Sequence, residues 1–291
     1  NYPSLPEPHH LFIAISRCDV TMDRPKFFLG IGFGILIVIV AALGYTLLSG
    51  NGDAATKHET FYQVSTIEAL QQGVYDGIQP VGALRTHGDF GIGTFDALDG
   101  EMIVLEGKVY QARADGSVHL VPDTLTTPFA TVTYFGRDFV LPIDETMNYS
   151  AFAIGMADRL PTENMVYAVR MHGTFPTIKV RAIPAQQKPY PKLSEAAANQ
   201  SVYTYENATG SVVGCYMPVF FEGLNVVGYH LHFISDDRQN GGHILDFTVP
   251  AGMEVEYDTT PGFSMILPTS GDFTEVDLSQ DLSEQLAEIE N

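Results

Sequence analysis

The longest apolar stretch of the chain, residues 27–48, contains 22 residues and no charged side chain. About 20 apolar residues are needed to span a bilayer, whereas the apolar core of a signal peptide has roughly 7–15. Arg24 and Lys26 precede this stretch, and Asp53 follows it. Because positive charges stay on the cytoplasmic side, we expect the rest of the chain to lie outside the cytoplasm.

We find no convincing small-x-small cleavage motif after the apolar stretch, which favours an uncleaved signal anchor over a cleaved signal peptide. The protein is then exported: it is membrane-anchored with an extracytoplasmic domain, or secreted if the segment is cleaved. A buried core helix is the competing interpretation, and the length of the charge-free run argues against it. The expected N-terminal organisation is an extension over residues 1–26, the anchor or signal over 27–48, and a linker over 49–58.

Helical patterns in the remaining chain are short and few. Residues 65–68 read Ser-Thr-Ile-Glu, a capping box that opens a helix, and Gly73 ends it. Pro161 ends a second helical pattern. This second pattern covers residues 151–160, and two more helices are expected over residues 194–200 and 279–290.

Strand patterns dominate from residue 101 onwards. Residues 102–105 and 109–111 flank Glu106-Gly107-Lys108 and predict a hairpin. Further strands are predicted over residues 130–135, 166–171, 177–183, 211–221, 228–234 and 243–249. The fold class is therefore α+β, with a mixed-sheet domain over residues 59–198 and a smaller β-rich domain over residues 199–291.

Three histidines of the second expected domain have the spacing of metal ligands. Residues 228–234, Gly-Tyr-His-Leu-His-Phe-Ile, alternate strictly. Successive strand residues point to opposite faces, so His230 and His232 share a face and can reach one ion. Turn-forming residues 235–242 lead to His243, which opens the next apolar strand. If the two strands form a hairpin, the three imidazoles converge.

Three imidazoles leave the fourth position of a tetrahedral metal site open, as in catalytic zinc sites. Zinc is the preferred ion because imidazole nitrogens suit it. The competing interpretation is that these histidines are structural and held by hydrogen bonds. A cupin-type metal site shares the His-x-His start but needs a glutamate a few residues downstream, and residues 235–238 contain none.

The charge balance narrows the class of partner. The chain carries 35 acidic and 15 basic residues, a net charge of -20, and phosphate binding needs clustered Lys and Arg, so a nucleic-acid partner is excluded. An anionic substrate needs a local positive centre, which a metal or a buried arginine can supply. The two cysteines, Cys18 and Cys215, exclude a cysteine-rich zinc site, and Cys215 lies in an apolar run that predicts burial.

Two charged residues beside apolar strands are further candidates. Glu101 begins an apolar strand, where a carboxylate is either solvated or held for proton chemistry. From the residues alone, solvation is favoured. Arg181 lies between Val180 and Ala182 and points to the opposite face of the strand, where it either holds an anionic substrate or forms a surface ion pair.

Several longer motifs occur in order between about residue 60 and the C-terminus. They are residues 88–94 (Gly-Asp-Phe-Gly-Ile-Gly-Thr), 98–102 (Leu-Asp-Gly-Glu-Met), 173–175 (Gly-Thr-Phe), 189–191 (Pro-Tyr-Pro), 228–234 and 241–243 (Gly-Gly-His). In these motifs the chain resembles the α-acetolactate decarboxylase family. The resemblance implies a two-domain enzyme that pairs as a homodimer.

The resemblance also implies a set of site residues. The zinc ligands are His230, His232 and His243. The other active-site residues are Thr94, Glu101, Arg181 and Glu290. Glu288 is the alternative to Glu290 at the C-terminus.

The implied reaction converts (S)-2-acetolactate to (R)-acetoin and carbon dioxide, a step of the butanediol pathway. Departure of the carboxylate leaves charge that the ketone oxygen takes up as an enediolate, and zinc stabilises this charge as a Lewis acid. In this scheme Arg181 holds the carboxylate or an enediolate oxygen, while Glu101 and Glu290 position a proton donor. Two other classes stay open: an exported domain that binds a metal or a small acid without catalysis, and a cupin-like metal oxygenase.

Overall fold

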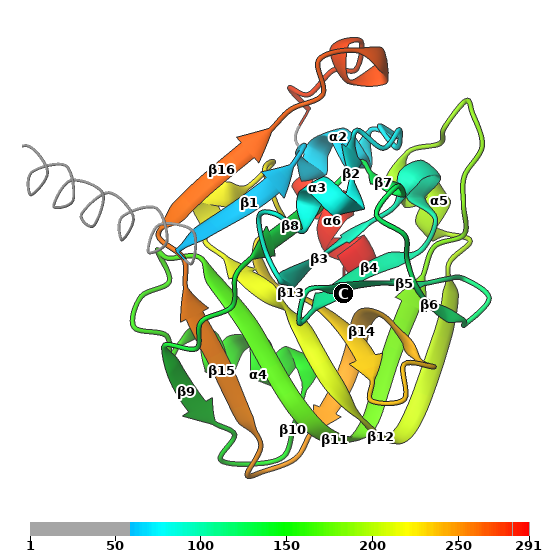
Figure 1. Cartoon of the computed structure of the whole chain (residues 1–291). Coiled ribbons are helices and arrows are strands. Elements are labelled where there is room, and N and C mark those ends of the chain that lie inside the picture. Colours follow the sequence, from blue (N-terminus) through cyan, green and yellow to red (C-terminus); the bar gives the residue numbers. More distant parts are fainter. Residues whose placement is uncertain (1–58, 281, 291) are drawn as a thin grey trace, which may run out of the picture. The chain divides into compact units, whose positions relative to one another are not determined.

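The computed structural model describes residues 59–280 and 282–290, which belong to one compact unit (Figure 1). The expected extension, the anchor or signal segment and the linker all lie outside the described residues. Two seven-stranded sheets and a few short helices make up the unit, so the expected β-rich α+β class is confirmed. Within the described ranges, no helix is long and apolar enough to cross a membrane.

The first sheet has the order β16-β1-β8-β3-β4-β5-β6. Only the pairing of β1 with β16 is parallel. The hairpin predicted around residue 107 is confirmed, with Glu106 and Gly107 both at positive φ in its turn. The strands are β1 (Thr60–Val64), β3 (Phe90–Thr94), β4 (Glu101–Leu105), β5 (Lys108–Ala112), β6 (Val118–Leu120), β8 (Ala130–Thr133) and β16 (Gly262–Ile266).

The second sheet is antiparallel and has the order β10-β14-β13-β12-β11-β15-β9. Its strand β14 also pairs with β11, so β11, β12, β13 and β14 close on themselves. A separate pair consists of β2 (Gln79–Pro80) and β7 (Thr126–Thr127). The strands of the second sheet are β9 (Phe139–Pro142), β10 (Met147–Asn148), β11 (Tyr167–Ala182), β12 (Ser201–Met217), β13 (Gly228–Ser235), β14 (Gly241–Val249) and β15 (Glu254–Thr259).

Strand β11 corrects one prediction, because residues 166–171 and 177–183 form parts of one strand and not two. Residues 172–175 continue the ladder with β12. Pro176 has no N–H to donate, and it lies between the pairing with β15, which ends at Met171, and the pairing with β14, which starts at Thr177. Proline is therefore tolerated in this long strand.

Four of the helices lie close to their predicted positions, with one change at a cap, whereas the short helix at Val81–Leu84 was not predicted. Thr66, and not Ser65, caps the first helix by accepting a hydrogen bond from the Ala69 amide at 3.2 Å. The helices are α2 (Ile67–Gln71), α3 (Val81–Leu84), α4 (Tyr149–Ala157), α5 (Leu193–Ala197) and α6 (Ser283–Glu290). Three 3₁₀ turns are η1 (Asp96–Leu98), η2 (Val219–Phe221) and η3 (Gly271–Thr274).

The two sheets pack face to face. Ile92 and Ile103 of the first sheet share a buried cluster with Ala168 and Val213 of the second. Buried Cys215, as predicted, belongs to the same cluster. The opposite face of the second sheet, which carries Tyr167, Val169 and Met171, is covered by α4.

The sheets do not divide at residue 198, where the boundary between the two expected domains lies. Strands β11 and β12 stand on either side of this residue and pair from Tyr167 with Tyr216 to Ala182 with Ser201. The first sheet likewise includes β16 from the C-terminal part of the chain. Both sheets therefore combine strands from both sides of residue 198.

Candidate active site

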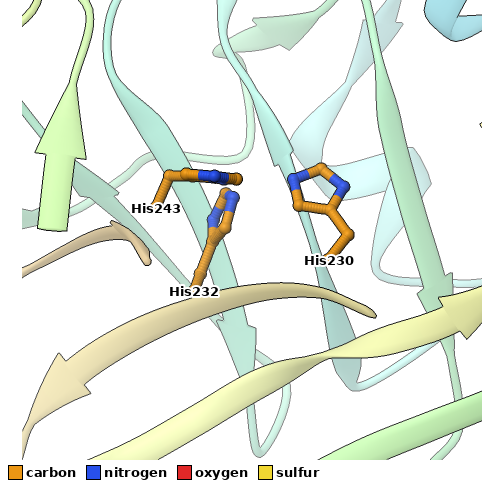
Figure 2. Close-up of side chains that lie close together, drawn as sticks. All are labelled: His230, His232 and His243. Carbon is orange, nitrogen blue, oxygen red and sulfur yellow. The ribbon is translucent and has the colours of Figure 1, made fainter. Parts of the chain in front are cut away.

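The three histidines converge as their spacing predicted. His232 on β13 and His243 on β14 are direct register partners, and His230 lies two residues along β13. The ring centroids are 5.1–5.3 Å apart, and one nitrogen of each ring lies within 4.8 Å of the others (Figure 2). The side chains are almost completely buried. A single ion can therefore be shared by all three.

The protonation state and the unpaired nitrogens of these rings suit metal coordination. Burial lowers the pKa of His230 to about 3 and holds the pKa of His232 and of His243 well below the usual value, so all three are neutral near pH 7. His230 Nδ1, His232 Nε2 and His243 Nδ1 have no hydrogen-bond partner among the described residues. A buried polar atom without a partner is costly. Coordination of a metal would satisfy these nitrogens, which weighs against purely structural histidines.

One hydrogen bond sets the orientation of His232. Its Nδ1 lies 2.9 Å from the carbonyl oxygen of Met102 on β4. Because a carbonyl only accepts, Nδ1 carries the proton and Nε2 keeps a free lone pair. This contact joins the first sheet to the ligand set of the second. Sequence reasoning did not include it, since a main-chain acceptor leaves no mark in the residue pattern.

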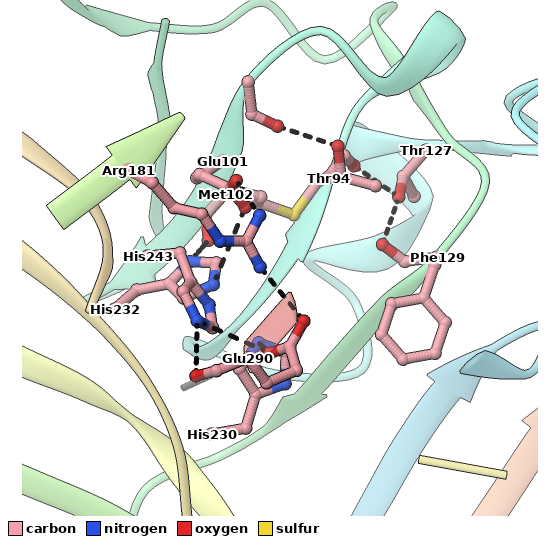
Figure 3. Close-up of polar contacts among 11 residues, drawn as sticks. Thr94, Glu101, Met102, Thr127, Phe129, Arg181, His230, His232, His243 and Glu290 are labelled. Carbon is pink, nitrogen blue, oxygen red and sulfur yellow. Dashed lines mark hydrogen bonds and ion pairs between the residues drawn. The ribbon is translucent and has the colours of Figure 1, made fainter. Parts of the chain in front are cut away.

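Arg181 lies beside the histidines, because it is the register partner of His243 across β11 and β14. Its side chain is 4% exposed and spans two carboxylates. Nη1 donates to Glu101 Oε1 at 3.3 Å, and Nη2 donates to Glu290 Oε1 at 3.0 Å (Figure 3). The interpretation of Arg181 as a surface ion pair is therefore wrong: its ion pairs are buried and face the site.

Glu101 opens β4 opposite Thr94 of β3 and is buried, so the interpretation of a solvated carboxylate is wrong. Burial raises its pKa to about 7, and nearby Glu290 adds to this, while Arg181 opposes it. Its Oε2 lies 3.8 Å from His232 Nε2. A carboxyl group with this pKa can hold or release a proton near neutral pH.

Glu290 ends α6 and reaches the site from the far end of the chain. Its Oε2 lies 3.4 Å from His230 Nε2 and 3.5 Å from His243 Nε2. Burial also raises its pKa, against the opposing effect of Arg181. Glu288 is exposed, because two residues along a helix point to different sides. The structure thus places Glu290, and not Glu288, at the site.

Thr94 is buried, and it shapes the backbone around the site. Its Oγ1 donates to the Gly100 carbonyl at 2.7 Å, while its own carbonyl accepts from Thr127 Oγ1 at 2.7 Å. The hydroxyl therefore fixes the turn that leads into Glu101. Thr94 lines the same small cavity as Glu101 and Arg181.

The cavity at the site has a volume of about 30 Å³ and one apolar side. Sequence reasoning missed this apolar wall, because its members are ordinary core residues from separate elements. They are Ile67, Leu70, Leu98, Phe129, Ile183 and Leu193. Among the residues that line the cavity, one guanidinium faces two carboxylates. With both carboxylates ionised, a divalent cation would turn an excess of one negative charge into an excess of one positive charge, and protonation of Glu101 would make the site more positive still, which favours an anionic ligand.

The chain is similar over most of its length to one family of known proteins. The family model for alpha-acetolactate decarboxylase matches residues 61–280. The alpha-acetolactate decarboxylase of Methanosarcina mazei is 48% identical over 232 residues, which cover 80% of each chain. That of Bacillus subtilis is 37% identical over 217 residues, 75% of this chain and 85% of the relative.

The fold agrees as well. The crystal structure of the alpha-acetolactate decarboxylase from Bacillus subtilis strain 168 superposes with a TM-score of 0.76 at 35% identity, and covers 79% of this chain and 98% of that one. The matched residues include the three histidines, Thr94, Glu101 and Arg181, whereas α6 lies beyond them. The chain belongs to the alpha-acetolactate decarboxylase family.

Proposed function

We propose that this protein converts (S)-2-acetolactate to (R)-acetoin and carbon dioxide. The observation that carries the proposal is the position of Arg181, which is held between two buried carboxylates beside three histidines with unpaired nitrogens. This arrangement joins an anion-binding group, a proton-holding group and a metal site within one small cavity. A domain that only stores a metal would not need the first two.

The histidines His230, His232 and His243 would hold the metal. We propose zinc, because three neutral imidazoles with an open fourth position suit it. The bound ion supplies a positive charge that lowers the energy of the negative charge developing on the substrate oxygens.

Arg181 binds the substrate carboxylate in this mechanism. Among the residues that the structure describes, it is the only cationic side chain that lines the cavity. Its Nε has no hydrogen-bond partner among the described residues, so a donor remains available for a substrate oxygen. Buried charge-assisted hydrogen bonds of this kind are strong and directional. Arg181 therefore orients the bond between C1 and C2 that breaks.

When this bond breaks, carbon dioxide leaves and the electron pair stays on C2. The neighbouring ketone takes up the charge as an enediolate, and a proton added to C2 gives acetoin. Glu101 holds that proton, because burial raises its pKa to about 7. Glu290 fixes the guanidinium from the other side. The apolar wall keeps bulk water from supplying the proton on the wrong face.

An assay with racemic 2-acetolactate under nitrogen, with zinc present, tests the proposal. We expect acetoin and carbon dioxide from the full chain. His232→Ala and Arg181→Ala should abolish their formation, while His119→Ala and Arg85→Ala, both exposed controls, should not. Activity close to wild type in either site variant would refute the mechanism. Metal binding without carbon dioxide release would indicate a binding domain without catalysis, and oxygen uptake in air would indicate a cupin-like oxygenase.

The location and assembly of the protein are also proposals. The uncharged residues 27–48 support export with a membrane anchor, or secretion after cleavage. N-terminal sequencing of the mature protein and membrane fractionation test this. Family resemblance supports a homodimer, and the mass of the purified protein by light scattering tests it.

A further inference from the structure

The last helix of the chain, α6, carries Glu290 into the site and is held at both of its ends. At its C-terminal end, Glu290 binds Arg181. At its N-terminal end, the carbonyl of Leu282 accepts the first helical hydrogen bond, from Leu286, at 3.0 Å. The same carbonyl accepts a second hydrogen bond, from Gln71 Nε2, also at 3.0 Å. Gln71 is the last residue of α2 and is 6% exposed.

One side of α6 packs against the apolar cluster, and another side borders a cavity. Leu286 packs into the apolar cluster that contains Ile67 and Leu70. Ser283 and Ala287 line a separate cavity of about 500 Å³, which is bounded on its other side by residues near Val219 and Tyr229. Glu290 lines both this cavity and the small one at the site.

The position and direction of the Glu290 side chain depend on where the helix starts. Each residue of an α-helix adds about 1.5 Å of rise, so an error of one residue at Leu282 would move Glu290 by about 1.5 Å and rotate it by about 100°. The buried amide of Gln71 binds the main chain at this starting point. A displacement of about 1 Å in a catalytic arrangement can reduce turnover by on the order of 100-fold.

We propose that Gln71 is a positioning residue, which fixes the start of α6 and thereby places Glu290 beside Arg181 and the histidines. This inference rests on the proposed decarboxylation, in which Glu290 orients the guanidinium. Gln71 acts through Glu290, because it does not line the small cavity at the site.

Gln71→Met tests the proposal, because it keeps the volume of the side chain and removes the donor. We expect kcat to fall on the order of 10-fold to 100-fold, with KM within about 2-fold. Gln72→Met is the matched control: its half-buried side chain donates only a long, solvent-exposed hydrogen bond, to Gln280 Oε1 at 3.4 Å, so kcat should stay within about 2-fold. Equal effects of the two substitutions would overturn the proposal. Gln71→Asn retracts the same donor and serves if the methionine variant does not fold.

A double-substitution cycle separates positioning from general stability. If Gln71 acts through Glu290, Gln71→Met should cause no further loss of kcat in a Glu290→Gln background. Two losses that multiply would overturn the proposal.

Hydrogen exchange of the α6 amides gives a readout that needs no turnover. In metal-free protein, Gln71→Met should speed exchange in residues 283–290 at least about 10-fold, while the strands keep their protection. Unchanged exchange in α6 would overturn the proposal. If the wild type makes no acetoin, the proposed function fails, and exchange still tests whether Gln71 holds α6.

Discussion

Arg181 and His243 face each other directly across β11 and β14. Directly opposed residues of antiparallel strands project from the same face. The guanidinium is therefore held beside the histidines by main-chain pairing and not by a flexible loop. The position that would hold a carboxylate and the position that would hold a metal are thus fixed relative to each other before any ligand binds.

Replacing Arg181 with lysine should show that geometry matters here as well as charge. Lysine keeps the positive charge but cannot donate to Glu101 and Glu290 from a planar fork. We expect kcat/KM to fall on the order of 100-fold or more, measured as acetoin formed from 2-acetolactate. Wild-type kcat/KM in Arg181→Lys would show that point charge alone is sufficient.

Removal of metal should inactivate and destabilise the protein. A ligand that binds only the folded state stabilises it by about 2.7 kcal/mol at a free concentration 100 times its Kd. We expect exhaustive chelation to abolish acetoin formation and lower Tm, and added zinc to restore both. His232→Ala, measured in parallel, should show no chelator effect on Tm. Full activity with metal shown to be absent by elemental analysis would rule out the metal role.

Glu101→Gln should change the pH dependence of stability in metal-free protein. The pKa of Glu101 is raised from 4.5 to about 7, so the folded state binds its proton more tightly than the unfolded state. Wild-type stability is therefore reduced as pH rises from about 4.5 to about 7, and the cost stays constant above that. The variant should gain on the order of 2 to 3 kcal/mol over wild type at pH 8 and little at pH 4, as urea denaturation would measure.

The comparison of Glu101→Gln with wild type removes the contribution of the histidines to the pH dependence of stability. The three buried histidines have lowered pKa values and cause stability to fall as pH drops below about 6.5, in both proteins alike. Their effect cancels in the difference between Glu101→Gln and wild type. A difference that does not depend on pH would show that Glu101 is not protonated preferentially in the folded state.

Gly214→Ala should damage the metal site from the neighbouring strand. A Cβ at Gly214 on β12 would overlap the main-chain carbonyl of His230 on β13. We expect a loss of about 1–3 kcal/mol in unfolding free energy and weaker zinc binding, since β13 must shift. Gly155→Ala in α4 is the control: nothing lies within 4 Å of its Cβ, so stability should be equal or higher. Similar melting temperatures for the two variants would contradict this account.

The sequence by itself determined the metal-binding face. Alternation along residues 228–234 places His230 and His232 on one face, and a turn-rich segment brings His243 back beside them, since a period of two and a tight turn are local properties. The hairpin of β4 and β5 was local in the same way, and so was α4, although it ends at Ala157 and not directly before Pro161.

Only the tertiary structure decided how the other site residues meet. From the residues alone, Glu101 read as solvated and Arg181 as a surface ion pair, because burial depends on which sheet packs on which. In the chain, Glu101 is 80 residues and Glu290 is 109 residues from Arg181. They meet because β14 pairs with β11, β4 of the first sheet packs against β13 and β14, and α6 returns to α2. Contacts of such separation are set by packing and register, which no local pattern encodes.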